Sequence, residues 1–342
     1  MAQEDESIPL EEMREFFRIA EVRQEESGLF RKNDSPPVPK VEQDYQDNDD
    51  EDFSPEEARR LLWEAEEMKQ PVVGYQILEK LGTGGSATVF KARDMNLDRV
   101  VALKLLYPAL AEDRKSLKTF VQEGMVMIRL QHPNILEGYD FGFSKGFYFQ
   151  VLEFIEGIAV DQYLDRGKRV REAEAVRIAL EVGRAIEHLQ SKRIVHRDIK
   201  PANILIVKRK GVKLCDFGLS LDLGKLAGGP GDQSDVTVGT IEYMSPEQAV
   251  GSKDLDVRAD LYSLGVTLFH MVSGRLPFDA ENREDILEKQ VKESLSFEGV
   301  ESLFSDSLKD LIHRLMAKDR EKRPPNAKSF LQEIKAISGS KS

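Results

Sequence analysis

The spacing of apolar residues changes from short strand-like runs to helical spacing along the chain. Strand-like runs extend from Gln76 to Leu81 and from Val89 to Arg93, and Val100 to Leu106 reads as a buried strand that contains one lysine. Leu117 to Leu130 has apolar residues at helical spacing, and helical patterns dominate from Gly157 onward. The pattern therefore predicts a strand-rich region with one helix, followed by a helical region.

The first 70 residues have a different pattern. Leu10 to Glu26 has apolar residues at helical spacing, whereas residues 33–52 are rich in Pro, Asp and Asn and are predicted to be disordered. Ser54 to Glu57 then forms a capping box with proline at the first helical position, which predicts a helix ending near Lys69. Two interpretations stay open for residues 1–70. They form either a solvated tail with transient helices or a docking or regulatory segment whose second helix packs on the strand-rich region.

Acidic residues are concentrated in this N-terminal extension. The 342 residues carry a formal net charge of −12. Residues 1–70 hold 22 of the 61 acidic and 9 of the 49 basic residues, a net charge of −13, which leaves 39 acidic and 40 basic residues for the rest. The remaining body is therefore nearly neutral. It shows no basic face of the kind that binds nucleic acid.

Composition also bears on the cellular compartment. No apolar run approaches the roughly 18–20 residues that a membrane helix needs. The N-terminus lacks the basic start and apolar core of a secretory signal. The single cysteine, Cys215, excludes internal disulfides and favours a reducing environment. These features predict a cytoplasmic protein without a membrane span.

Two short polar segments carry the most informative chemistry. The octapeptide His196–Asn203 is followed, after a predicted hairpin, by a second segment that begins at Asp216. Asp198 can accept or orient a proton, and Lys200 can neutralise charge on a transferring phosphoryl group. Asn203 and Asp216 offer the hard oxygen ligands that Mg²⁺ prefers. This combination suits a protein that holds a metal-bound triphosphate against a hydroxyl group.

A glycine-rich stretch upstream could cradle the phosphates. Glycine lets backbone N–H groups approach phosphate oxygens without a Cβ in the way. Lys104, in the apolar run that follows, is costly to bury unpaired and therefore needs an anion. The triphosphate is one candidate, and Glu123 in the next predicted helix is the expected protein partner. The residues of the glycine-rich stretch are Leu81, Gly82, Thr83, Gly84, Gly85, Ser86, Ala87, Thr88 and Val89.

Taken in order, these motifs resemble those of the eukaryotic-type protein kinases, and of the bacterial Hanks-type serine/threonine kinases in particular. The resemblance extends from Gly74 to about Ile337. It implies a two-lobed α+β fold, with a β-rich N-lobe and hinge at residues 74–156 and a helical C-lobe at residues 157–337. It also implies phosphorylation of protein Ser/Thr hydroxyls by ATP, with Mg²⁺ or alternatively Mn²⁺ as the ion. The alternative is a nucleotide-binding pseudokinase scaffold, although no catalytic position is missing.

The resemblance assigns nucleotide contacts to single residues. It implies that Lys104 contacts the α- and β-phosphates and pairs with Glu123. Backbone groups from Glu153 to Ile155 are expected to contact adenine, with Leu152 as the gatekeeper. The side chains implied to sandwich the adenine ring are Val89, Ala102 and Leu205. One departure concerns Ala87, which stands at the family's third loop glycine and resists positive φ, so a slightly stiffer loop is expected.

Substrate class and regulation rest on further matches. Lys200 and Thr240 match the serine/threonine pattern, in which the threonine hydrogen-bonds the catalytic Asp198 and the lysine. Arg197 resembles an arginine that binds phosphate on the activation loop, here Leu219 to about Ser245. The candidate phosphorylation sites on that loop are Ser234 and Thr237, and the alternative is a loop that is never modified. Structural roles are implied for His196, Glu247 and Arg323, the last two as an ion pair. The sequence does not predict which proteins are phosphorylated.

Overall fold

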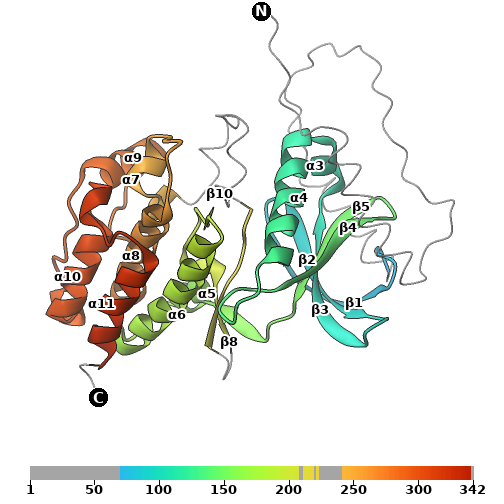
Figure 1. Ribbon diagram of the computed structural model, residues 1–342, viewed down its shortest axis with the longest axis horizontal. Coiled ribbons are helices and arrows are strands. Elements are labelled where there is room, and N and C mark those ends of the chain that lie inside the picture. The colour runs from blue at the N-terminus through green and yellow to red at the C-terminus, as the bar shows by residue number, and fades with distance from the viewer. Residues whose placement is uncertain (1–69, 208–210, 219–220, 223–240, 340–342) are drawn as a thin grey trace, which may run out of the picture. The chain divides into compact units, whose positions relative to one another are not determined.

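The computed structural model describes residues 70–207, 211–218, 221–222 and 241–339 (Figure 1). They belong to two compact units. The first includes residues 70–117 and Asp140–Leu152, and the second includes Lys118–Tyr139 and the described residues from Glu153 onward. The N-terminal extension, with its predicted helices and linker, lies outside the described residues. Its role therefore stays a prediction. The boundary predicted between residues 156 and 157 and the predicted cytoplasmic location also stay predictions.

A five-stranded sheet forms most of the first unit. Its strands are β1 (Tyr75–Thr83), β2 (Ala87–Asp94), β3 (Arg99–Leu106), β4 (Gly138–Ser144) and β5 (Phe147–Glu153), in the order β1-β2-β3-β5-β4. The short helix α3 (Pro108–Glu112) follows β3. Alternating side chains of β2 and β3 are buried on one face, among them Phe90, Val101 and Leu103. The turn between these strands is closed by Asp94, whose Oδ1 accepts hydrogen bonds from the amides of Asn96 and Leu97.

Helices dominate the second unit, as Figure 1 shows for the part coloured from yellow-green to red. The helices are α4 (Arg114–Arg129, which begins in the first unit), α5 (Val160–Leu164), α6 (Glu172–Ser191), α7 (Pro246–Ala249), α8 (Val257–Ser273), α9 (Arg283–Lys292), α10 (Asp306–Leu315) and α11 (Ala327–Gly339). Two small sheets carry the loops discussed below. One has the order β6-β8-β9, from β6 (Gly157–Ala159), β8 (Ile204–Val207) and β9 (Gly211–Leu214), and the other pairs β7 (Ile194–Val195) with β10 (Leu221–Asp222).

Helix α8 forms the centre of the second unit. Asp256 caps its N-terminus by accepting a hydrogen bond from the Arg258 amide, and Gly274 ends it in the left-handed conformation at φ 74°. Fifteen of its 17 residues are buried. A helix that is apolar on all sides belongs in a core. Because the core holds α8 on every side, its few polar side chains, such as Asp260, have fixed positions.

The strand-rich region followed by a helical region is confirmed, and so is the α+β class. The helix predicted from Leu117 to Leu130 appears as α4. Within the described residues, no helix is both long and apolar enough to cross a membrane.

Candidate functional site

Asp198, Lys200 and Asn203 lie together on the loop that follows β7. Asn203 ends the short 3-10 helix η1 (Pro201–Asn203), which begins with proline and places the asparagine back beside the aspartate. Nδ2 of Asn203 donates to Oδ2 of Asp198 at 2.9 Å and to the Asp198 carbonyl at 2.8 Å. Nζ of Lys200 lies 2.8 Å from Oδ2 of Asp198. The Asp198 side chain, only 11% exposed, is thus held by one cation and one amide donor.

The backbone of this loop is fixed from the core. His196 and Arg197 donate their amide protons to the two carboxylate oxygens of Asp260, at 2.9 and 2.8 Å. Asp260 is fully buried in α8, so burial raises the pKa of its carboxyl, while the amides of His196 and Arg197 and the Arg197 charge oppose that rise. Arg197 has φ 70°, a left-handed conformation that is uncommon outside glycine. A buried acid therefore holds a strained turn directly before Asp198.

His196 connects this loop to the segment of Asp216. Its ring is buried against Phe217, with centroids 4.7 Å apart. Nδ1 accepts from the Asp198 amide at 3.3 Å, and Nε2 lies 3.2 Å from the Cys215 carbonyl. Since an amide can only donate and a carbonyl can only accept, these partners require the neutral tautomer with its proton on Nε2. The ring is fully engaged by backbone, which fits the structural role expected of it.

Asn203 and Asp216 have the chemistry of magnesium ligands. The Asn203 carbonyl accepts from the Cys215 amide at 2.9 Å, so Asn203 is bonded to the residue before Asp216. Because Nδ2 of Asn203 points to Asp198, its amide oxygen points elsewhere and can accept an ion. Asp216 is exposed and adopts φ 63°. Mg²⁺ typically takes one or two protein oxygens and completes its shell with phosphate and water, so this donor pair fits.

The glycine-rich stretch is the turn between β1 and β2. The Gly84 amide donates to the Ala87 carbonyl at 2.9 Å, and a Cβ built on Gly82 or Gly85 would meet nothing within 4 Å. Open space above these glycines suits the approach of phosphate oxygens. Ala87 is buried and is absent from the residues with positive φ, so this position does not require a glycine.

Tyr107 is a functional candidate that the sequence did not reveal. Its hydroxyl donates to the Gly84 carbonyl at 2.7 Å, and its amide donates to the Ser86 carbonyl at 3.0 Å. The residue directly after β3 thus clamps the glycine-rich turn at two points. No spacing rule relates position 107 to position 84, so only the fold shows this contact.

Val89, Ala102 and Lys104 share one face of the sheet. Val89 pairs with Lys104 across β2 and β3, and Lys91 pairs with Ala102. Cross-strand partners and residues two apart point to the same side. Thr88, fully buried, belongs to the opposite face, so its side chain is not part of this surface. The expected adenine contacts from β2 and β3 and the expected phosphate-binding lysine therefore lie on one surface of the first unit.

Other expected contacts are distributed over the second unit. Leu205 lies in β8 opposite Lys213, and Nζ of Lys213 lies 2.6 Å from the Glu153 carboxylate. The Glu153 amide donates to the Glu137 carbonyl at 2.8 Å. Glu123 is buried in α4, and a Cβ built on Gly218 would lie 3.9 Å from its Oε2. Leu152 is buried at the end of β5 in the first unit, and Ile155 follows Glu153 in the segment before β6.

Glu247 and Arg323 form a bidentate ion pair. The two N–O distances are 2.6 and 2.9 Å, and the Arg323 side chain is fully buried. Arg323 also donates to the carbonyls of Ala317 and Arg258. The pair therefore joins α7 to the segment that precedes α11 and has the geometry of a structural tie. Thr240, Ser234 and Thr237 lie outside the described residues.

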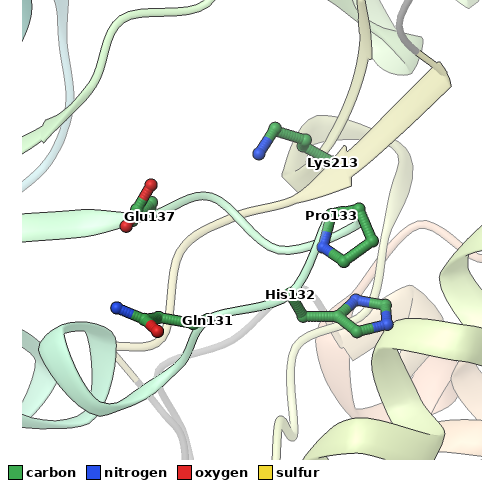
Figure 2. A pocket seen from close by; sticks show the side chains of 5 residues that line it. All are labelled: Gln131, His132, Pro133, Glu137 and Lys213. Carbon is green, nitrogen blue, oxygen red and sulfur yellow. The ribbon is translucent and has the colours of Figure 1, made fainter.

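A surface pocket of about 380 Å³ lies elsewhere on the second unit (Figure 2). It is lined by Gln131, His132, Pro133, Glu137 and Lys213, from the loop between α4 and β4 and from β9. The His132 ring stacks on His188 with centroids 5.1 Å apart, and burial lowers the pKa of both imidazoles. None of the residues with an expected catalytic or nucleotide-binding role lines this pocket.

Comparisons with a family pattern and with individual known proteins indicate the same family. The protein kinase domain pattern matches residues 75–334. Serine/threonine-protein kinase PrkC of Bacillus subtilis is 35% identical over 262 residues, which cover 76% of this chain and 40% of that protein. Serine/threonine-protein kinase pkn3 of Myxococcus xanthus is 34% identical over 272 residues, covering 77% and 50%. A probable serine/threonine-protein kinase PknB of Lactococcus lactis is 31% identical over 262 residues, covering 76% and 41%. The match to each of these relatives therefore spans half of its length or less.

Proposed function

The chain belongs to the protein kinase family, and on that premise we propose that it transfers the γ-phosphoryl group of ATP to serine and threonine hydroxyls of proteins. The observation that carries the proposal is the Asp198 carboxylate, held 2.8 Å from Lys200 and 2.9 Å from Asn203 on one loop. An acid in this setting can orient a hydroxyl group. The neighbouring cation, Lys200, can interact electrostatically with the phosphoryl group that the hydroxyl attacks.

Each residue of the loop has one task in the proposed reaction. Asp198 orients the substrate hydroxyl and accepts its proton late, while the oxygen bonds to the γ-phosphorus and ADP leaves. Lys200 neutralises charge on the transferred group. Asn203 and Asp216 would hold Mg²⁺, which would supply positive charge to offset that of the triphosphate. In the first unit, Lys104 and the glycine-rich turn bind the phosphates, with Tyr107 holding the turn.

The proposal extends to regulation through the activation loop. Arg197 directly precedes Asp198. A phosphate that pairs with the Arg197 guanidinium would therefore connect the activation loop to the loop that carries Asp198. We propose that the kinase phosphorylates Ser234 or Thr237 of its own loop, and that this phosphate pairs with Arg197. The alternative is a loop that is never modified.

Asp198→Asn tests the proposed reaction. The variant should bind ATP as the wild type does, because the amide keeps the shape of the side chain, but transfer should fall by about 10³-fold or more because the proton acceptor is lost. Transfer of radiolabel from [γ-³²P]ATP to a degenerate Ser/Thr peptide mixture measures the rate, and fluorescent-nucleotide titration measures binding. An undiminished rate would remove Asp198 from the mechanism. Nucleotide binding without transfer by the wild type would favour the pseudokinase scaffold.

The same two proteins test the regulation. Phosphopeptide mass spectrometry of wild type after incubation with ATP should find phosphate between Leu219 and Ser245, and the Asp198→Asn protein should carry none. An active wild-type enzyme with an unmodified loop would contradict autophosphorylation and leave the phosphotransfer proposal intact.

A further inference from the structure

Gln248 makes a hydrogen bond from α7 to the catalytic loop. Its side-chain amide nitrogen, Nε2, donates to the carbonyl of Arg197 at 2.9 Å, and the two residues are 51 positions apart in the sequence. Gln248 is buried, at 7% exposed, and Arg197 is half-buried. Gln248 stands next to Glu247, outside the set of residues to which the motifs assign a role.

The orientation of the Gln248 amide follows from its partners. Oε1 accepts from the Ser245 amide at 3.2 Å and from the Ser245 hydroxyl at 3.1 Å, completing a capping box at the start of α7. A backbone amide is an obligate donor and a backbone carbonyl an obligate acceptor. Oε1 must therefore face Ser245, and Nε2 must face Arg197. Only a side chain with an acceptor and a donor at these two atoms satisfies both ends.

The peptide group between Arg197 and Asp198 is consequently held at both edges. Its carbonyl accepts from Gln248, and its amide, that of Asp198, donates to Nδ1 of His196 at 3.3 Å. The preceding amide of Arg197 donates to Asp260. With φ 70°, Arg197 is in a strained conformation that persists only where surrounding contacts hold it. A change in ψ of Arg197 that φ of Asp198 does not compensate would turn the Cα–Cβ bond of Asp198.

We propose that Gln248 is a positioning residue for Asp198, which acts by fixing the Arg197–Asp198 peptide. The inference rests on the proposed kinase function and adds to it a residue of α7. Loss of the Gln248 donor removes this partner of the Arg197 carbonyl and frees the peptide to rotate. Misplacement of a catalytic group by about 1 Å can reduce the rate about 100-fold. Nucleotide binding does not depend on this peptide and should not change.

The competing interpretation is that Gln248 only caps α7. Gln248→Glu distinguishes the positioning role from the capping role. A carboxylate still accepts from Ser245 but presents an oxygen, not a donor, to the Arg197 carbonyl. Ser245→Ala is the matched control, since it removes the capping hydroxyl and leaves the Gln248–Arg197 bond in place. Gln248→Met, which keeps the length of the side chain without its polar atoms, is the second variant if the glutamate variant does not fold.

The experiment measures kcat and KM for ATP with the degenerate Ser/Thr peptide mixture, the affinity for MgADP, and the melting temperature. Gln248→Glu and Gln248→Met should lower kcat by about 10- to 100-fold, with KM for ATP and MgADP affinity unchanged. Ser245→Ala should lower the melting temperature and leave kcat unchanged. Full kcat in folded Gln248→Glu or Gln248→Met protein, or an equal kcat loss in Ser245→Ala, would overturn the positioning role. A wild type without any phosphoryl transfer would instead refute the proposed function. That outcome is distinct from a fall in kcat of the variants measured against an active wild type.

Discussion

At the scale of single residues, polar groups in this chain gain their properties from what they touch. Lys318 illustrates this, because its Nζ donates to the Tyr262 hydroxyl at 3.0 Å and to the carbonyls of Lys289 and Gln290 at 3.2 and 2.7 Å. It also lies 4.1 Å from the centre of the Phe278 ring. The two carbonyls belong to the last turn of α9, where a cation is favoured by the helix dipole.

The environment of Lys318 predicts a pH-dependent stability. Burial, followed by the Arg323 guanidinium, lowers its pKa from 10.5 to about 8, while Glu293 opposes the shift. Between these two values the unfolded chain binds more protons than the folded protein, so the Lys318 contribution to stability rises as pH rises from about 8 to 10.5. The melting temperature of wild type minus that of Lys318→Met should therefore increase over this window. The exposed Lys322→Met provides the control for loss of a surface lysine. A difference that falls or stays flat for Lys318→Met would contradict the prediction.

At the scale of elements, helix packing in the second unit depends on close approach at Gly265. A Cβ built on this residue of α8 would lie 2.8 Å from Cβ of Leu315 and 3.0 Å from Cγ of Met316, at the end of α10. A Cβ–Cβ separation of 2.8 Å cannot be relieved by rotating a side chain. Because the backbone must move, overpacking should outweigh the better helix propensity of alanine.

Gly265→Ala should accordingly destabilise the protein by about 1–3 kcal/mol, the usual range for overpacking a core. Urea denaturation followed by circular dichroism measures the change. Gly339→Ala, at the end of α11 where a Cβ meets nothing within 4 Å, is the control and should be neutral. Unchanged or increased stability of Gly265→Ala would show that α10 shifts without cost.

At the scale of the whole molecule, the charge asymmetry separates the extension from the catalytic body. All placed site residues lie after position 70, and removal of residues 1–69 changes the formal net charge from −12 to +1. The interpretation of the extension as a solvated tail predicts that the truncated protein keeps its kcat on the peptide mixture to within about twofold. Steady-state kinetics of both lengths provide the measurement. A large rise or fall in kcat would instead identify the extension as a regulator of the kinase.

Much of the candidate site was predictable because its residues are close in sequence. The octapeptide from His196 to Asn203 is local, so its residue types alone indicate an acid, a cation and a metal ligand within one loop. The glycine-rich turn and the strand with Lys104 are equally local. Their order along the chain was enough for the family, and the alternation of apolar and polar positions was enough for the strand-rich and helical regions.

The contacts that hold these groups in place could not be predicted in the same way. Tyr107 bonds to Gly84, Gln248 to Arg197, and Asp260 to the amides of His196 and Arg197, and in every case the partner is a backbone group. Backbone carbonyls and amides are the same at all positions, so the sequence carries no sign of which one a distant side chain will meet. The sequence by itself therefore determined the chemical groups, their order and the family. Only the tertiary structure decided which side chains fix their geometry, because that depends on where remote parts of the chain are brought together by the core.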